Sequence, residues 1–425
     1  MQMNKLYVGE NIIKVDVQDK VVGKALYPDD LYFEDMLYLR IKRATHPHAI
    51  LRRIDISKAE QLPGVVKIIT AADIPWVKNF GLIIKDQPVL IGIGQKMRYM
   101  GDALAIIIAE NKEIASQALR LIEVEVEKLE VISDPLRAME KDAPPIHDRG
   151  NILVTHYLEK GDVERGFKKA DIIVEKEYRT SFLDHIPLQV ESGVGVFDAK
   201  TGMINLWVAT QWIHDTQADM AQSLGLPKDK IRIIQPAIGG AFGKREDISV
   251  HLHLALAAMT TKRPVKLTYT REESMIAQSK RHAFIMRAKT GATKAGYLTA
   301  WQVEVIGDTG AYASSGPAVV HKGMYHCTGP YNVDNVKGVA YTVYTNNTYA
   351  GAMRGFGATQ MAFAYESQMD ILAHELGIDP VQFRLQNAYD IGSSTPNQQI
   401  LNSSVRVKDT IQEAARMAGW PEKKL

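Results

Sequence analysis

Only one cysteine, Cys327, occurs in the 425 residues of this chain. A single cysteine excludes an internal disulfide framework, and it excludes an iron–sulfur cluster held by cysteines of this chain alone. The formal net charge is only +2, which indicates neither a nucleic-acid surface nor a polybasic membrane patch. No apolar run approaches the ~20 residues of a transmembrane helix. We therefore expect no nucleic-acid partner and no membrane partner.

Familiar targeting and phosphate-binding signatures are missing as well. The N-terminus has Asn4, Lys5 and Glu10 spaced through it and so lacks the apolar core of a signal peptide. We expect a cytoplasmic protein. The chain has no Walker A loop, and no Gly-x-Gly-x-x-Gly stands at the head of a Rossmann unit.

The histidines give no clear metal signal. His251 and His253 lie on one predicted helix, but residues two apart do not share a helix face. We interpret them as core or surface residues. His185 and Glu191 could form an acid/base pair, although their spacing says nothing about contact.

What is present is the composition of a globular protein, with 46% hydrophobic and 24% charged residues. The length predicts two or three domains. Short β-prone stretches at Leu37–Arg43 and Val65–Thr70 and an apolar run at Ala103–Ala109 predict three strands. Asn111 is a plausible N-cap for the helical pattern that follows. Prolines at 135, 144 and 145 mark the expected boundary, which gives domains 1–140 and 141–425.

Two glycine-rich segments are the most informative feature of the second domain. The first glycine loop, residues 239–246, reads GGAFGKRE, and the second glycine loop, residues 352–357, reads AMRGFG. A predicted strand precedes each loop, at Ile231–Ile234 and at residues 339–345, and a helix follows each, at residues 248–260 and 361–376. Glycine lets backbone amides approach a ligand and adopt positive φ, and runs of such amides hold anions. The two loops, with polar Gln211 upstream, suggest one buried cofactor.

At these residues the chain resembles the molybdenum-binding subunit of the xanthine oxidase family of molybdenum hydroxylases. The first loop resembles the family's Gly-Gly-x-Phe-Gly loop, and residues 352–360 resemble its Ala-x-Arg-Gly-x-Gly-x-x-Gln loop. Residues 46–49, 62–65, 72–75 and 99–102 resemble its α/β hammerhead domain. The resemblance implies an α+β fold, with a hammerhead domain followed by the first half of a molybdopterin-binding region.

The resemblance also implies roles for particular residues. Gln211 would hydrogen-bond an oxygen ligand of the molybdenum and, with Glu246, would serve catalysis. Phe242 and Arg354 would lie beside the metal with Gln211. Phe356 would stack on a flat aromatic substrate, with Glu246 and Lys322 as further substrate contacts. The residues expected to bind the cofactor are Gln211, Gly240, Ala241, Phe242, Gly243, Ala352, Met353, Arg354 and Gly355.

Lys322 falls where purine-hydroxylating members carry an arginine. The lysine lacks the bidentate fork of a guanidinium but keeps the positive charge. This change favours an acidic N-heterocycle, and the expected reaction is hydroxylation of nicotinate next to the ring nitrogen, with water as oxygen source and NADP as acceptor. A purine- or aldehyde-oxidising member remains the nearest alternative. The second loop has no cysteine for a copper–sulfur bridge, which disfavours a carbon monoxide dehydrogenase, and a non-catalytic molybdopterin-binding paralogue stays open.

The family's Gly-Gln-Gly segment is absent from this sequence, and no Val-Gly-Glu, near which the family places its catalytic glutamate, follows the second glycine loop. We therefore expect a split form, in which a second molybdopterin subunit carries the catalytic Glu. An iron–sulfur subunit with [2Fe-2S] clusters and an FAD subunit would complete the complex. The expected cofactor is molybdopterin cytosine dinucleotide with molybdenum and a terminal sulfur or selenium ligand.

Overall fold

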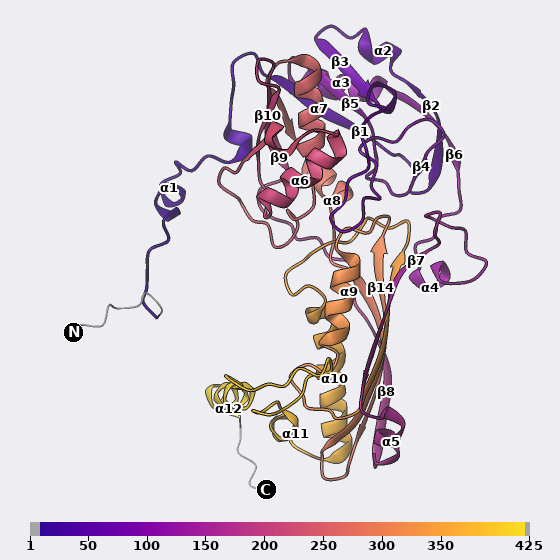
Figure 1. Ribbon diagram of the computed structural model, residues 1–425, viewed down its shortest axis with the longest axis vertical. Coiled ribbons are helices and arrows are strands. Elements are labelled where there is room, and N and C mark those ends of the chain that lie inside the picture. The colour runs from indigo at the N-terminus through magenta and orange to yellow at the C-terminus, as the bar shows by residue number, and fades with distance from the viewer. Residues whose placement is uncertain (1–8, 421–425) are drawn as a thin grey trace.

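The computed structural model describes residues 9–420. Asn4 and Lys5, on which part of the signal-peptide argument rests, lie outside the described residues. The chain forms two bodies stacked along its long axis (Figure 1). The upper body carries the N-terminal strands together with α6 and α7, and the lower body carries α9, α10 and a long twisted sheet. Helices and sheets are mixed in both bodies, so the fold is α+β, as predicted.

The upper body is built on a seven-stranded mixed sheet. Strands from both predicted domains share it, because β1 pairs in parallel with β12 and antiparallel with β5. β5 is buried at every position, as its apolar run predicts for a strand covered on both faces. The order is β11 (Ile231–Ile234), β10 (Met203–Val208), β9 (Ser192–Asp198), β12 (Val265–Thr268), β1 (Leu37–Arg43), β5 (Ala103–Ala109) and β3 (Val65–Thr70). A smaller sheet has the order β4 (Lys96–Met97), β2 (Ala49–Asp55) and β6 (Glu123–Lys128).

Helix α7 (His251–Thr261) packs closely on this sheet. Its residues 251–258 are all buried, as expected for a helix that is apolar on every side. Glycine in β9 permits the close approach. A Cβ on Gly193 would lie 2.5 Å from a methyl of Val208 and 2.8 Å from one of Leu254. The first glycine loop lies between β11 and α7 and is therefore fixed to a rigid core.

The lower body is a five-stranded sheet with helices α9 and α10 running along it (Figure 1). Its order is β7 (Ile152–Lys160), β15 (Val336–Tyr344), β14 (Leu298–Gly310), β13 (Ala283–Ala292) and β8 (Ile172–Arg179). Phe284, Trp301 and Met361 are fully buried in its core, and Cys327 is buried there too. α10 (Ala358–Leu376) begins directly after the second glycine loop, with Gly357 as its N-cap.

The predicted helices and strands around both loops are confirmed to within a few residues. The Asn111 cap is confirmed as well, because its side chain accepts a hydrogen bond from the N–H of Ile114. The remaining helices are α1 (Val17–Val21), α2 (Ser57–Glu60), α3 (Lys112–Leu121), α4 (Pro135–Ala138), α5 (Val163–Lys168), α6 (Ile213–Leu224), α8 (Arg271–Ala277), α9 (Gly316–Tyr325), α11 (Pro380–Asn387) and α12 (Val407–Met417), with 3-10 turns at Pro28–Asp30, Ala71–Asp73 and Lys228–Lys230.

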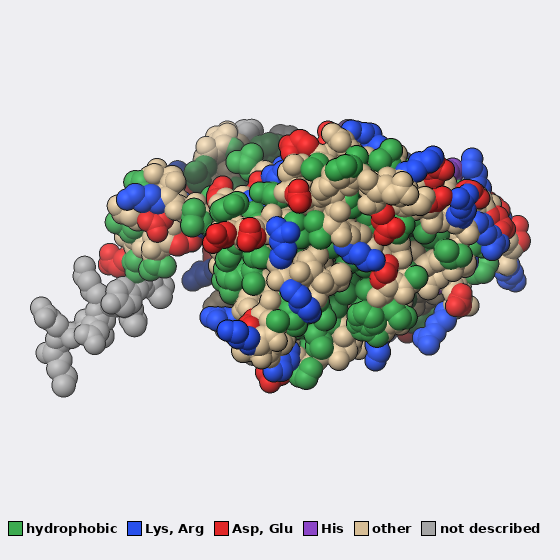
Figure 2. All heavy atoms as spheres, turned by 90° about the horizontal axis from the view of Figure 1, so that it is seen from above, with side chains coloured by type: hydrophobic (Ala, Val, Ile, Leu, Met, Phe, Trp, Pro, Cys, Tyr) green, Lys and Arg blue, Asp and Glu red, His purple; other side chains and the backbone are tan. Residues whose placement is uncertain are grey.

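Within residues 9–420, none of the helices combines the length and the apolar character that crossing a bilayer requires. On the face seen from above, basic and acidic side chains are interspersed rather than gathered by sign (Figure 2). This mixture agrees with the near-neutral net charge of the chain.

Candidate cofactor site

The two glycine loops, far apart in the sequence, meet between the two bodies. The N–H of Arg354 donates to the carbonyl of Phe242 at 2.9 Å. A Cβ on Gly243 would lie 2.3 Å from the carbonyl oxygen of Ala352, so only glycine allows the backbones to come this close. Gly243 also has a φ of 105°, which disfavours any side chain there. The contact between the loops therefore depends on this glycine.

Gln211 joins the same junction from the end of β10. Its N–H donates to the carbonyl of Arg245 at 2.9 Å, and its Oε1 accepts from the N–H of Gly243 at 2.9 Å. Among the described residues its Nε2 has no acceptor. The side chain is exposed. An amide donor is thus held at the edge of the loops and remains available to a ligand.

Backbone donors are also available in the loops. Gly243 donates to Gln211, and Phe356 donates to Met353. Within residues 9–420, the backbone N–H groups of the predicted cofactor residues Gly240, Ala241, Phe242, Ala352, Met353 and Gly355 find no acceptor. Unpaired amides in a glycine-rich turn form the type of concavity that binds anionic groups.

The aromatic residue of each loop has a strained backbone. Phe242 has a φ of 57° and Phe356 a φ of 52°, in the left-handed region that bulky residues rarely adopt. Such a conformation costs about 1–3 kcal/mol and persists where the surroundings enforce it, often at functional sites. Phe242 keeps 49% of its surface exposed. Both loops therefore hold their aromatic residue in a backbone conformation that costs free energy.

A cavity of about 280 Å³ lies at the junction. Its lining is Gln211, Phe242, Gly243, Glu246, Ala352, Met353, Arg354 and Phe356. Three other predicted cofactor residues, Gly240, Ala241 and Gly355, belong to the same loops but do not line this cavity. Lys322, on α9, does not line it either. Its Nζ lies 5.9 Å from the centre of the Phe356 ring, close enough for a cation–π contact.

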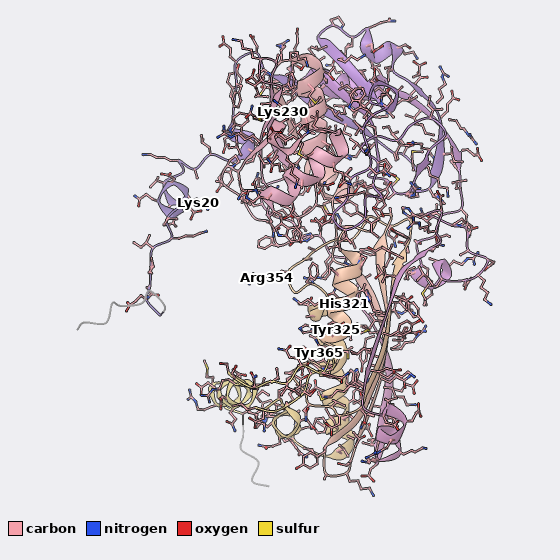
Figure 3. The ribbon with its side chains drawn as sticks, viewed as in Figure 1. Lys20, Lys230, His321, Tyr325, Arg354 and Tyr365 are labelled. Atoms are coloured by element: carbon pink, nitrogen blue, oxygen red, sulfur yellow. The ribbon has the colours of Figure 1, made fainter. Side chains whose placement is uncertain are left out.

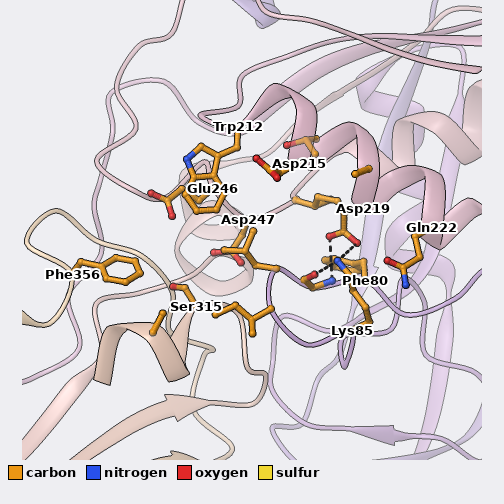
Figure 4. A pocket seen from close by; sticks show the side chains of 17 residues that line it. Phe80, Lys85, Trp212, Asp215, Asp219, Gln222, Glu246, Asp247, Ser315 and Phe356 are labelled. Carbon is orange, nitrogen blue, oxygen red and sulfur yellow. Dashed lines mark hydrogen bonds and ion pairs between the residues drawn. The ribbon is translucent and has the colours of Figure 1, made fainter. Parts of the chain in front are cut away.

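A second cavity of about 310 Å³ adjoins the first and shares Glu246 and Phe356 with it (Figure 4). Lys85 pairs with Asp219 at 2.8 Å on its wall. Lys85 comes from the loop before β4 and Asp219 from the middle of α6. Residues so far apart in the chain and in no common motif gave no signal in the sequence that they line one cavity. Trp212, which also lines this cavity, could have been suspected because it follows Gln211 directly.

Glu246 borders both cavities and has an unusual proton affinity. Burial, and to a lesser degree the charge of the neighbouring Asp247, raise the pKa of its carboxyl to about 7. Its Oε2 is buried without a hydrogen-bond partner. Burial likewise raises the pKa of Asp247 to about 6, against the hydrogen bond that Ser314 donates to it. Glu246 can therefore exist as acid or as carboxylate near neutral pH.

The basic side chains of the first loop do not face the cavity. Lys244 is 1% exposed and Arg245 is 3% exposed. Nζ of Lys244 donates to the carboxylate of Asp184 at 2.9 Å. The Arg245 guanidinium donates to the carbonyls of Gly240 and Gln189 at 2.9 and 2.7 Å. These two cations fix the loop to the protein on the side away from the cavity. The donors of the first loop that remain free for a ligand are therefore backbone N–H groups.

The histidines take structural positions. His185 and Glu191 form no hydrogen bond with each other. Nε2 of His185 instead lies 2.7 Å from the carbonyl oxygen of Ala352. The two carboxylate oxygens of Glu191 are buried without a hydrogen-bond partner. His251 and His253 are buried on α7, as expected for core residues, and in the described part of the chain no three His, Cys, Asp or Glu side chains cluster to hold a metal ion.

Comparison with known families identifies the class of protein. The model of the molybdopterin cofactor-binding domain matches residues 146–388, and that of the aldehyde oxidase and xanthine dehydrogenase a/b hammerhead domain matches residues 22–130. The chain belongs to the xanthine oxidase family of molybdenum hydroxylases, as a molybdopterin-binding subunit. The predicted hammerhead and molybdopterin-binding architecture is thereby confirmed.

Particular relatives sharpen the comparison. The chain is 44% identical to the nicotinate dehydrogenase large molybdopterin subunit of Eubacterium barkeri, over 97% of this chain and 96% of that protein. It is 39% identical to a Bacillus subtilis protein named as a probable xanthine dehydrogenase subunit, over 89% of this chain and 51% of that one. The solved aldehyde oxidoreductase from Desulfovibrio gigas matches with a TM-score of 0.88 and 29% identity, over 94% of this chain and 45% of that one. The chain thus spans about half the length of the latter two.

The residues at the junction fit a molybdopterin group. A large anionic cofactor requires many donors, a close backbone approach and few side chains in the way. The loops supply unpaired amides, the contact at Gly243 and the free Nε2 of Gln211. The absence of a protein-only metal cluster among the described residues is compatible with a metal held by the cofactor itself.

Proposed function

We propose that this chain is the large molybdopterin-binding subunit of a multi-subunit hydroxylase that oxidises nicotinate next to the ring nitrogen, with water as oxygen source and NADP as acceptor. The observation that carries the proposal is the junction of the two loops, with Lys322 beside Phe356 at its rim. The relative named nicotinate dehydrogenase supports the choice of substrate. A panel of nicotinate, xanthine and aldehydes, assayed with the native complex and NADP, tests it. Higher kcat/KM for xanthine or an aldehyde would overturn it.

The cofactor supplies the redox chemistry when bound, and this chain supplies binding and electrostatics. The free amides of the two loops would hold its anionic parts, and Nε2 of Gln211 would offer it a further donor. Phe242 and Arg354 border the same space. Donors that are fixed before the reaction stabilise developing charge without reorganisation. We propose the cytosine dinucleotide form, with sulfur or selenium completing the metal.

Gly243→Ala is expected to lower the molybdenum content of the purified complex several-fold. The new methyl would meet the Ala352 carbonyl at 2.3 Å and would sit at a φ of 105°, a strain of roughly 1–3 kcal/mol. The measurement is molybdenum per complex by elemental analysis. Gly202→Ala is the control, because Gly202 also has positive φ, but a Cβ there meets nothing within 4 Å. Equal molybdenum in the Gly243→Ala and wild-type complexes would contradict the role of this contact.

The substrate would lie between Phe356 and the wall that carries Glu246. Phe356 offers a flat face for stacking, and Lys322 offers a positive charge 5.9 Å from that ring. The Phe356 face would stack on the ring of a pyridine carboxylate, and the Lys322 charge would attract its carboxylate. Glu246, whose Oε2 has no partner, can accept or donate a proton at a polar edge of the ring.

Lys322→Met is expected to raise KM for nicotinate about tenfold, which corresponds to a loss of ~1.4 kcal/mol of binding. The lost contact is the charge opposite the carboxylate, so KM for an uncharged pyridine such as nicotinamide should stay within about twofold. Lys322→Arg keeps the charge and should retain most of the affinity. Steady-state kinetics on both substrates is the measurement. Equal rises in both KM values would argue against a carboxylate contact.

Purine oxidation is the second candidate function. The unpartnered Glu246 carboxyl favours it, because such a group can hydrogen-bond the polar edge of a purine. The relative named as a xanthine dehydrogenase subunit is compatible with it. Aldehyde oxidation and a non-catalytic molybdopterin-binding role have no comparable feature in this chain. A complex that contains molybdenum but oxidises no substrate of the panel would support the non-catalytic role.

We propose that a second molybdopterin subunit carrying the catalytic Glu covers the open side of the junction. Gln211 and Arg354 are exposed in this chain, and α12 has no buried residue. Arg354, His321, Tyr325 and Tyr365 lie along one side of the lower body (Figure 3). Iron–sulfur and FAD subunits would carry the electrons onward, in a cytoplasmic complex. Mass spectrometry of the native complex tests this composition, and full activity from this chain alone would contradict it.

A further inference from the structure

A short segment, residues 184–189, contacts both glycine loops although it belongs to neither. We call it the clasp segment. It follows β8 and precedes β9, and the backbone of its neighbour Leu183 accepts a hydrogen bond from the N–H of Arg281. On its other side, the Arg271 guanidinium donates to the carbonyls of Pro187 and Leu188. The segment is therefore anchored at residues outside the loops.

The clasp segment reaches the second loop through His185. Nε2 of this buried ring lies 2.7 Å from the carbonyl oxygen of Ala352. A carbonyl can only accept, so Nε2 carries the proton. Burial lowers the pKa of His185 to about 4, and the ring is neutral with a bare Nδ1 at neutral pH. The Ala352 carbonyl that it holds is the atom against which Gly243 packs.

The clasp segment reaches the first loop at its two ends. At its start, the Asp184 carboxylate accepts from Nζ of Lys244 at 2.9 Å. At its end, Oε1 of Gln189 accepts from the N–H of Gly239 at 2.7 Å, and the Gln189 carbonyl accepts from Arg245. The first loop is thus tied to the segment through its first residue and through two cations.

The Asp184 carboxylate also contacts the segment that hydrogen-bonds to the residues just before the second loop. Nζ of Lys280 lies 2.8 Å from Asp184. The N–H of Lys280 donates to Tyr349, and its carbonyl accepts from Gly351, the residue before the second loop. Asp184 therefore links the two loops, through Lys244 to the first and through Lys280 to the second. The adjacent His185 contacts the second loop directly, at the Ala352 carbonyl.

We propose that His185 is a positioning residue, and that through it the clasp segment sets how closely the two cofactor loops approach. It touches neither of the two cavities and acts through Ala352 and Gly243. The proposal rests on the proposed function only in assuming that these loops hold the cofactor. A misplacement of ~1 Å at a reacting centre can cost about 100-fold in rate, so a small shift at Ala352 matters even if the cofactor stays bound.

The test uses His185→Leu, which removes the donor, and His185→Gln, whose amide can restore it. Hydrogen–deuterium exchange in the native complex should rise about tenfold in peptides covering residues 239–246 and 350–357 of the leucine variant. Its kcat should fall about tenfold, with KM and molybdenum content within about twofold of wild type. The glutamine variant should regain most of both. If the leucine variant does not assemble, His185→Asn, whose amide is too short to reach the carbonyl, takes its place.

The matched control is His253→Leu, because His253 is also buried and its Nε2 lies 3.3 Å from the Val89 carbonyl, away from the loops. Wild-type exchange in both loops of the His185→Leu complex would overturn the proposal. An equally large rise of loop exchange in the His253→Leu complex would overturn it as well. The exchange measurement does not depend on turnover. A wild-type complex that fails to oxidise nicotinate would refute the proposed substrate, while the role of His185 could still be tested by hydrogen–deuterium exchange.

Discussion

Gln211→Ala is expected to lower kcat about 100-fold, equivalent to ~3 kcal/mol of barrier, while the complex keeps its molybdenum. The side chain performs two tasks at the junction. Oε1 fixes the N–H of Gly243, and Nε2 is free to donate to the bound cofactor. The loop amides that hold the rest of the cofactor are untouched by the substitution, so occupancy should survive. Turnover and elemental analysis of the same preparation are the measurements.

Two further variants separate the tasks of this glutamine. Gln211→Glu keeps an acceptor for the Gly243 N–H but loses the donor, so we expect a loss as large as that of the alanine variant. Gln217→Ala is the control, because Gln217 donates to the carbonyls of Lys228 and Ile231 and does not line the cavity. Wild-type kcat in Gln211→Ala would refute the catalytic role. If Gln211→Ala lowers kcat but Gln211→Glu has wild-type kcat, the loss in the alanine variant comes from the contact with the Gly243 N–H and not from the Nε2 donor.

The local pattern of the sequence was enough to predict the elements that carry the site. Apolar runs and turn residues located β1, β3, β5 and β11, and the strands and helices on either side of each glycine loop. These signals are local, since burial and periodicity leave their mark in neighbouring residues. The pairing of β1 with β12 left no such mark. It joins strands from both predicted domains into one sheet, and only tertiary packing decides it.

The candidate site was predictable only in part for a similar reason. Gly243 and Phe242 stood out because their residue types are unusual in sequence and resemble a family motif. Nothing in the sequence indicated the partner of Lys244, because its charge is neutralised by Asp184, a carboxylate 60 residues away in the chain. The position of His185 against Ala352 had no sequence signal, because nothing in a lone histidine says which carbonyl it will meet.

Asp184→Asn is expected to lower the free energy of unfolding by about 3–5 kcal/mol, the usual cost of removing one partner of a buried ion pair. The side chain of Asp184 is 5% exposed, that of Lys244 is 0% exposed and that of Lys280 is 11% exposed. The asparagine would leave both ammonium groups without a counter-charge. Chemical denaturation of the purified complex is the measurement. Asp409→Asn is the control, since its pair with Arg406 lies on the surface, where such pairs contribute about 0–1 kcal/mol.

The pH dependence of stability gives the same prediction a second readout. Burial alone would raise the pKa of Asp184, but hydrogen bonds from Lys280, Ile186 and Lys244 lower it to about 2, below its ordinary value of 3.8. A lowered pKa means that the folded state binds the proton less tightly than the unfolded state. The contribution of Asp184 to stability is therefore complete above pH ~4 and is lost as the pH falls toward 2. The wild-type complex should lose stability over this window, and the Asp184→Asn complex should lose less. Parallel curves for the two proteins would mean that Asp184 does not carry its charge between the two lysines.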